Sequence, residues 1–178
     1  LAPFNGVIQN SYSDFLIGVL NCFSSAELGG IAGRNSGLIK NSYSENMVGD
    51  TIPTGFTGGL VGINEVSGIL SNSYSSARLI GSSIGGFVGD NQGTIIQSYC
   101  YIPPTSGATS CIGVGNGGAT QEFTLANFYS KTHSVYSSWD FDLVWNEVSS
   151  NLPELKYSTS LISNCEIINS PGTYYLNR

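Results

Sequence analysis

The sequence predicts an all-β fold, a parallel β-solenoid of about five to six coils with a C-terminal cap or tail. Three observations lead to this prediction. A unit with its glycine pairs at residues 29, 58 and 85 recurs in the middle of the chain. Each unit consists of short runs of alternating side chains separated by glycines, and no stretch before residue 140 has the 3.6-residue period of a helix. Such units bury their apolar side only against one another, so they are expected to stack.

The repeat is most complete at residues 29–44, 58–75 and 85–100. A decayed fourth copy starts near Cys111, and residues 5–13 match only the second half of the unit. Weak half-copies occupy residues 19–24 and 127–130. The array therefore begins inside a repeat, which leaves a strand edge at its first coil.

Glycines recur at fixed places in each copy, and we expect them at tight corners that need a positive φ or a close backbone approach. These positions are Gly30, Gly33, Gly59, Gly62, Gly86 and Gly89. One aligned position is always asparagine, and stacked coils would join these amides into a ladder. Its members are Asn35, Asn64 and Asn91.

Tyrosine also recurs at one aligned position, and stacking predicts an aromatic column of Tyr12, Tyr43, Tyr74 and Tyr99. If residues 39–44 form one strand, alternation places Ile39, Asn41 and Tyr43 on one face and Lys40, Ser42 and Ser44 on the other. We expect the Ile/Tyr face to be the interior and the serines to face outward.

The pattern GGxVGxNxGxIxNSYS, carried by residues 58–75 and 85–100, resembles the GLUG motif of bacterial surface proteins, which include large secreted adhesins and the stalks of some immunoglobulin A proteases. Residues 139–145 and 152–156 resemble the WDF…W…P.L tail that often follows such arrays. The organisation implied is solenoid repeats at 1–130 and a closing segment at 131–156. Residues 157–178 remain as a strand or tail that caps the array or contacts another subunit.

Composition excludes two classes of partner. The chain has 6 basic and 12 acidic residues, too few cations for the basic stripe that binds nucleic acid. No window approaches the 18 or so apolar residues of a membrane-spanning helix, so we expect no membrane insertion.

Four cysteines allow three pairings or none. We favour Cys100 with Cys111, which flank the loop that contains Pro103 and Pro104, and this choice leaves Cys22 with Cys165. Alternation places Cys22 and Cys100 on the outward face. Unpaired thiols are the alternative, and zinc is disfavoured because there is no CxxC and only one histidine.

No catalytic or metal centre is expected, and hence no cofactor. His133 lies in a polar stretch without a nucleophile motif beside it. Alternation puts Asp140 and Asp142 together on a solvated face opposite Phe141. Asp90 follows a glycine-rich segment similar to calcium-binding β-roll repeats, but the other copies do not repeat it.

The sequence therefore predicts a non-enzymatic, secreted or cell-surface protein with a structural or adhesive role. It would act as a stalk or as a subunit of a head-to-tail filament, with itself or a surface glycan as partner. The alternative is a carbohydrate-binding or carbohydrate-cleaving module on a β-helix. Ice binding is disfavoured because regular threonine arrays are absent.

Overall fold

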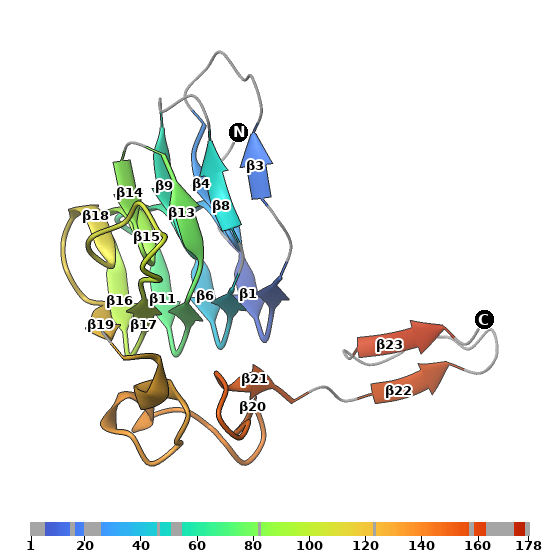
Figure 1. Ribbon diagram of the computed structural model, residues 1–178. Coiled ribbons are helices and arrows are strands. Elements are labelled where there is room, and N and C mark those ends of the chain that lie inside the picture. The colour runs from blue at the N-terminus through green and yellow to red at the C-terminus, as the bar shows by residue number, and fades with distance from the viewer. Residues whose placement is uncertain are drawn as a thin grey trace.

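The protein is all-β, with most of its strands in parallel sheets (Figure 1). The computed structural model describes residues 6–14, 17–19, 26–45, 47–50, 55–81, 83–122, 124–156, 159–162 and 173–176. The helices in these ranges are the short 3-10 helices η1 (Leu125–Phe128) and η2 (Ser134–Tyr136). Within the same ranges, no helix has the length and apolar character needed to cross a bilayer.

Five parallel sheets, named A to E here, contain the repeats. Sheet A has β5 (Ala32–Asn35), β10 (Val61–Asn64), β15 (Val88–Asn91) and β18 (Ile112–Gly115). Sheet B has β1 (Val7–Gln9), β6 (Leu38–Lys40), β11 (Ile69–Ser71) and β16 (Thr94–Ile96). Sheet C has β2 (Tyr12–Ser13), β7 (Tyr43–Ser44), β12 (Tyr74–Ser75), β17 (Tyr99–Tyr101) and β19 (Thr120–Glu122).

The two remaining parallel sheets of the repeats have three strands each. Sheet D has β3 (Ile17–Val19), β8 (Met47–Asp50) and β13 (Arg78–Ile80). Sheet E has β4 (Leu28–Gly29), β9 (Phe56–Gly58) and β14 (Ser83–Gly85). Two smaller pairs follow in the chain, an antiparallel one and a parallel one. They are β20 (Trp145–Asn146) with β21 (Glu154–Leu155), and β22 (Thr159–Ile162) with β23 (Thr173–Leu176).

Equivalent strands of successive repeats are neighbours in each of sheets A to E, and their equivalent residues pair. Leu70 lies opposite Ile39 on one side and Ile95 on the other. The decayed fourth copy supplies β18, and the half-copy at the start supplies β1 and β2. The weak copy at 127–130 is not a strand, because Asn127 and Phe128 belong to η1. Most of the other weak copy lies outside the described residues.

A left-handed residue separates sheets B and C in each repeat, and it makes the alternation predicted through residues 39–44 wrong. Asn41 has a φ of 49°, and its equivalents Asn10, Asn72 and Gln97 have φ values between 44° and 52°. Asparagine tolerates this conformation better than most residues. The turn resets the alternation, so Ser42 and Ser44 are fully buried rather than outward, while Ile39 and Tyr43 lie in different hydrophobic clusters.

The glycines allow sheets A and E to lie in close contact. A Cβ on Gly62 would lie 2.6 Å from the carbonyl oxygen of Gly33 and 2.9 Å from the backbone nitrogen of Leu28. A Cβ on Gly59 would overlap both the Ser75 hydroxyl and the Gly86 carbonyl. None of the aligned glycines is among the residues with positive φ. Close backbone approach, rather than left-handed geometry, therefore explains this part of the motif.

Two apolar clusters fill the space between the sheets. The larger consists of Ile39, Leu60, Val61, Leu70, Phe87, Val88, Cys100 and Cys111. The smaller consists of Leu28, Val48, Ala77, Leu79 and Ala108. Each fully buried aliphatic side chain contributes roughly 1.5–3 kcal/mol. The tyrosines belong to neither cluster.

Candidate functional site: stacked columns and the covered tyrosine face

The aligned asparagines form a continuous amide ladder at the end of the sheet A strands. Asn35 Nδ2 donates to Asn64 Oδ1, and Asn64 Nδ2 donates to Asn91 Oδ1, both at 2.8 Å. Asn91 Nδ2 donates to the backbone oxygen of Asn116 at 2.8 Å, which ends the ladder in the fourth copy. All three aligned amides are fully buried. The ladder ties the repeats together along the stacking direction.

A second ladder, of serine hydroxyls, was missed at the sequence level. Ser42 Oγ donates to the backbone oxygen two residues earlier at 2.9 Å, and Ser73 Oγ and Ser98 Oγ do the same. Ser73 Oγ also accepts the backbone N–H of Ser42 from the preceding repeat at 3.1 Å. Each hydroxyl thus spans the left-handed corner and links two layers. The available signal was the recurring Asn-Ser or Gln-Ser pair at this point of each copy.

The tyrosines stack as a column on the side of sheet C that faces away from the repeat interior. Tyr12 and Tyr43 have ring centroids 5.3 Å apart, and Tyr43 and Tyr74 are 5.0 Å apart with an interplanar angle of 3°. Tyr99 continues the register after Tyr74. The serines and the cysteine that follow these tyrosines point inward instead, because neighbouring positions of a strand face opposite ways.

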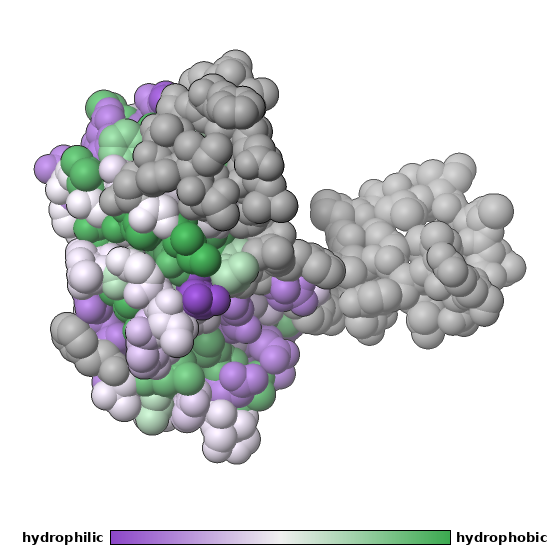
Figure 2. Space-filling view, turned by 45° about the horizontal axis from the view of Figure 1, so that its top comes forward, coloured by the Kyte–Doolittle hydropathy of each residue, from purple (hydrophilic) through white to green (hydrophobic). Residues whose placement is uncertain are grey.

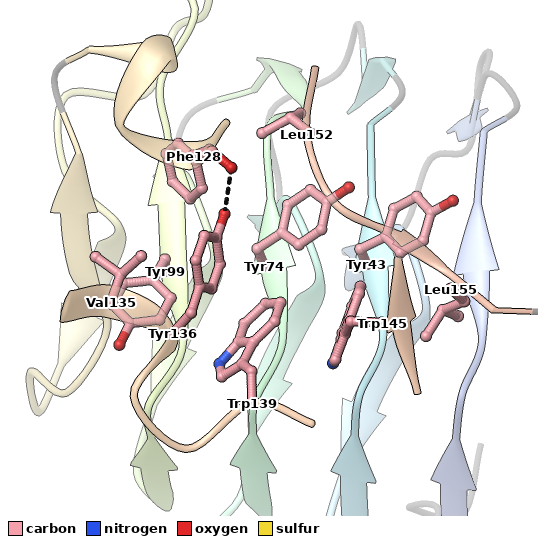
Figure 3. Close-up of a cluster of buried hydrophobic side chains, with 10 residues drawn as sticks. All are labelled: Tyr43, Tyr74, Tyr99, Phe128, Val135, Tyr136, Trp139, Trp145, Leu152 and Leu155. Atoms are coloured by element: carbon pink, nitrogen blue, oxygen red, sulfur yellow. Dashed lines mark hydrogen bonds between the residues drawn. The ribbon is translucent and has the colours of Figure 1, made fainter. Parts of the chain in front are cut away.

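Residues 124–156, called the C-terminal cover here, pack on this tyrosine face (Figure 3). Trp145 lies against Tyr43 and Tyr74, with centroids about 6 Å apart in both pairs. Trp139 lies against Tyr74 and Tyr99 in the same way, and its Nε1 donates to the backbone oxygen of Gln97 at 2.9 Å. The predicted interior position of the tyrosines is therefore wrong. Tyr43, Tyr74 and Tyr99 are buried under a separate segment instead, and Tyr12 is 44% exposed.

The closing motif is a turn rather than the strand that alternation assumed. Asp140 Oδ1 accepts the backbone N–H groups of Asp142 at 2.9 Å and Leu143 at 2.8 Å. Lys156 Nζ donates to the backbone oxygens of Phe141 and Asp142, each at 2.8 Å. Asp140 and Asp142 are exposed. Asp140 is therefore used to fix the turn that positions the two tryptophans.

Cys100 and Cys111 form a disulfide, with an S–S distance of 2.03 Å and a Cα–Cα distance of 5.7 Å. The predicted outward position of Cys100 is wrong, because both sulfurs lie in the larger cluster between the sheets. Cys22 and Cys165 lie outside the described residues. Their pairing stays a prediction.

The other candidate residues lie apart from one another. His133 precedes η2, and its Nδ1 accepts the backbone N–H of Val135 at 3.4 Å. Asp90 is nearly buried and accepts a hydrogen bond from Gln92 Nε2 at 2.8 Å. Arg34 pairs with Glu27 and Glu65. In the part of the chain that the structure describes, no group of three or more His, Cys, Asp or Glu side chains is placed to hold a metal ion.

Burial also widens the pH range over which the tyrosines of this region stay neutral. It raises the pKa of Tyr99 to about 12, and it raises the pKa of Tyr74 and of Tyr136 well above the usual value. These phenols are therefore neutral hydrogen-bond donors at physiological pH. The Tyr136 hydroxyl donates to the backbone oxygen of Phe128 at 2.9 Å (Figure 3).

On the part of the outer surface that the structure describes, no single chemistry dominates. Figure 2 shows polar and apolar side chains interspersed over the described part of one face. The exposed aliphatic side chains of Val66, Ile96 and Leu143 belong to different elements, whereas Val7 and Ile69 lie in one column of sheet B with Leu38 between them. Scattered apolar residues of this kind are normal on protein surfaces.

No family model, no curated protein and no solved structure matches this chain. Backbone and side-chain hydrogen bonds connect each repeat to the next, and the C-terminal cover buries the tyrosine face of sheet C.

Proposed function

We propose that this chain is a parallel β-solenoid of the GLUG-repeat type, belonging to a secreted or cell-surface protein with a structural or adhesive role. It serves as a stalk segment or as a subunit of a head-to-tail filament. The observation that carries this proposal is the in-register pairing of equivalent strands from successive repeats. We infer no catalytic activity and no cofactor.

The contribution of each repeat to the sheets supports the proposed architecture. Residues 56–80 add one strand to each of the five sheets, and the residues before and after them repeat the pattern. Successive layers then lie about 4.8 Å apart, the spacing of hydrogen-bonded strands. The amide and serine ladders run in the same direction, so pulling the layers apart would break several hydrogen bonds per layer.

The disulfide supports a location outside the cytosol. Disulfides form and persist in oxidising compartments and are rare in the cytosol. The Cys100–Cys111 bond lies beside the last complete repeat. We propose that it locks the loop that leads from β17 to β18.

Self-association is the proposed form of assembly. In the described residues, β1 and β2 are the terminal strands of sheets B and C, and β16 and β19 are terminal at the other end. A terminal strand keeps backbone groups on its outer side that pair readily with another strand. The two ends of one molecule differ, so stacking between copies would run head to tail.

Negative-stain electron microscopy at increasing protein concentration tests this assembly. We expect end-to-end particles that lengthen with concentration. Val7→Asp places a charge on the terminal layer at a side chain 60% exposed, and it should shorten them. Val66→Asp is the matched control, because Val66 is 77% exposed on a turn in the middle of the array. Particles that never exceed the monomer would contradict the filament.

A carbohydrate module is the alternative, and a glycan array distinguishes it. Sugar-binding sites commonly use exposed aromatic rings. Both tryptophans of this chain, Trp139 and Trp145, are buried between the cover and sheet C, at 7% and 0% exposure, whereas Tyr12 is 44% exposed. Specific glycan binding lost on substitution of an exposed side chain would favour the alternative over the structural role.

A further inference from the structure

The Tyr74 hydroxyl stands between two hydrogen-bond acceptors. Its oxygen lies 2.6 Å from Glu45 Oε1 and 2.9 Å from the backbone oxygen of Pro153. Tyr74 is fully buried in the tyrosine column, Glu45 follows β7 of the preceding repeat, and Pro153 belongs to the C-terminal cover. The contact therefore joins two repeats to the cover at one atom.

One phenol proton cannot serve both acceptors. If Glu45 is ionised, it only accepts, so the Tyr74 proton satisfies either the carboxylate or Pro153, and the other oxygen faces the phenol oxygen with no proton between them. If Glu45 is protonated, its O–H donates to the Tyr74 oxygen and Tyr74 donates to Pro153. Both short contacts are then hydrogen bonds. The bond between Tyr74 and Pro153 is the costly one to leave unmade, because both of these residues are buried, whereas Glu45 is exposed to water.

The surroundings of Glu45 also favour its protonated form. Glu45 is an exposed residue, but its carboxyl oxygen lies at the partly buried contact with Tyr74. Desolvation there raises the pKa of Glu45, and the carboxylates of Glu154 on β21 and Asp14 after β2 raise it further. The hydrogen bond from Tyr74 acts in the opposite direction but does not reverse the shift. The pKa of Tyr74 itself is raised well above 10, so the carboxyl is the group that titrates near neutral or acid pH.

We propose that Glu45, Tyr74 and Pro153 form a proton-dependent latch that holds the C-terminal cover on the tyrosine face. Uptake of a proton by Glu45 completes the chain of hydrogen bonds and tightens the cover. Loss of that proton leaves a charged carboxylate next to Glu154 and loosens it. This latch rests on contacts between described residues and does not depend on the proposed function.

The direction of the pH effect follows from linkage. With the cover docked, the carboxyl binds its proton more tightly than in the undocked state, where the pKa returns toward the ordinary 4.5. Docking is therefore strongest below that value and weakens as the pH rises through the raised pKa of the docked state. Each unit of difference between the two pKa values weakens docking about tenfold.

Tryptophan fluorescence measures the docking, because both tryptophans of the chain belong to the cover and pack on the tyrosine column. We would record acrylamide quenching from about pH 4 to about pH 8, where a shifted carboxyl titrates. In the wild type, quenching should rise with pH in one transition whose midpoint lies above 4.5. Glu45→Gln keeps a donor toward Tyr74 without a titrating group, so its quenching should stay low throughout.

Two further variants keep the test decisive. Asp142→Asn removes an exposed carboxylate from the same cover and should leave the wild-type transition in place. Tyr74→Phe removes the shared proton and should abolish the transition while raising quenching at low pH. A wild-type profile that is flat, that has its midpoint at or below 4.5, or that Glu45→Gln reproduces would overturn the latch.

Discussion

Different interactions stabilise the repeat region and the C-terminal cover. In the repeats, the same few residue types recur at the same places, and backbone ladders, amide ladders and glycine contacts connect each layer to the next. In the cover, two short 3-10 helices and one pair of two-residue strands hold side chains that do not repeat. These side chains pack on the tyrosine face of sheet C. Loss of one layer contact should therefore weaken many layers, whereas loss of one cover contact should release the cover alone.

The largest expected effect is at a glycine of the repeats. Gly59→Val should cost more than about 5 kcal/mol, because its side chain would overlap the Ser75 hydroxyl and the Gly86 carbonyl. Gly86→Val should cost less, because a Cβ there would lie 2.9 Å from Ile102 Cγ1 and 3.0 Å from Cys100 Sγ, which are side-chain atoms rather than backbone. Thermal unfolding followed by circular dichroism measures the loss. Gly117→Val is the control, since a Cβ there meets nothing within 4 Å. Equal melting of Gly59→Val and the control would refute the close-packing explanation.

A smaller and more local effect is expected in the cover. Trp145→Ala should cost about 3–5 kcal/mol of cover stability, because a fully buried ring leaves the tyrosine face. Limited proteolysis should then cut residues 124–156 while the repeats stay intact. Leu143→Ala is the control, since this side chain is 80% exposed. If Trp145→Ala unfolded the repeats in the same transition, the two regions would not be separable.

Removal of the disulfide, which lies in the repeat region, should cause the next largest loss of stability. Replacing Cys100 and Cys111 by serine should lower stability by about 2–4 kcal/mol, because the unfolded chain is no longer constrained. Urea unfolding monitored by circular dichroism gives the difference. In reducing agent, the stability of the wild type should approach that of the variant. Identical unfolding of the oxidised wild type and the variant would argue against a stabilising bond.

The amide ladder should contribute less than the disulfide. Asn64→Ala removes one donor and one acceptor from the buried ladder, which should cost about 2 kcal/mol through the groups left unpaired on Asn35 and Asn91. Asn146→Ala serves as the exposed control in the cover. Both are compared by urea titration. A loss no greater than that of the control would mean that the ladder is incidental.

The smallest effect should come from the single histidine. His133→Ala removes only a 3.4 Å contact to the Val135 N–H before η2, so stability should fall by no more than about 0.5 kcal/mol. Differential scanning calorimetry is sensitive enough to measure it. A loss of several kcal/mol would reveal a role for His133 that its contacts do not explain.

The repeat region was the more predictable part, because its periodicity is visible in the sequence. Alignment alone paired Asn35 with Asn64 and Asn91, and the structure contains that ladder. Alternation failed where one residue broke the strand. Asn41 adopts a left-handed conformation, so the chain turns at this residue. Ser44 therefore lies in the interior and Tyr43 on the outer face of sheet C, the reverse of what alternation predicted.

The cover was less predictable, because its residues do not repeat and its contacts join segments far apart in the chain. Tyr74 and Pro153 are 79 residues apart. The aromatic motif at 139–145 indicated a closing segment, but nothing in it specified the tyrosine face as its binding surface. The outward position of that face depends on the left-handed conformation of Asn41, which strand alternation does not predict.

The central claim is that equivalent residues of successive repeats are neighbours in parallel sheets, and nuclear Overhauser contacts between strands test it most directly. We expect contacts from the backbone of Leu70 to both Ile39 and Ile95, and from Asn64 to both Asn35 and Asn91, in the parallel pattern. Contacts in an antiparallel pattern, or in a register shifted from these pairs, would contradict it.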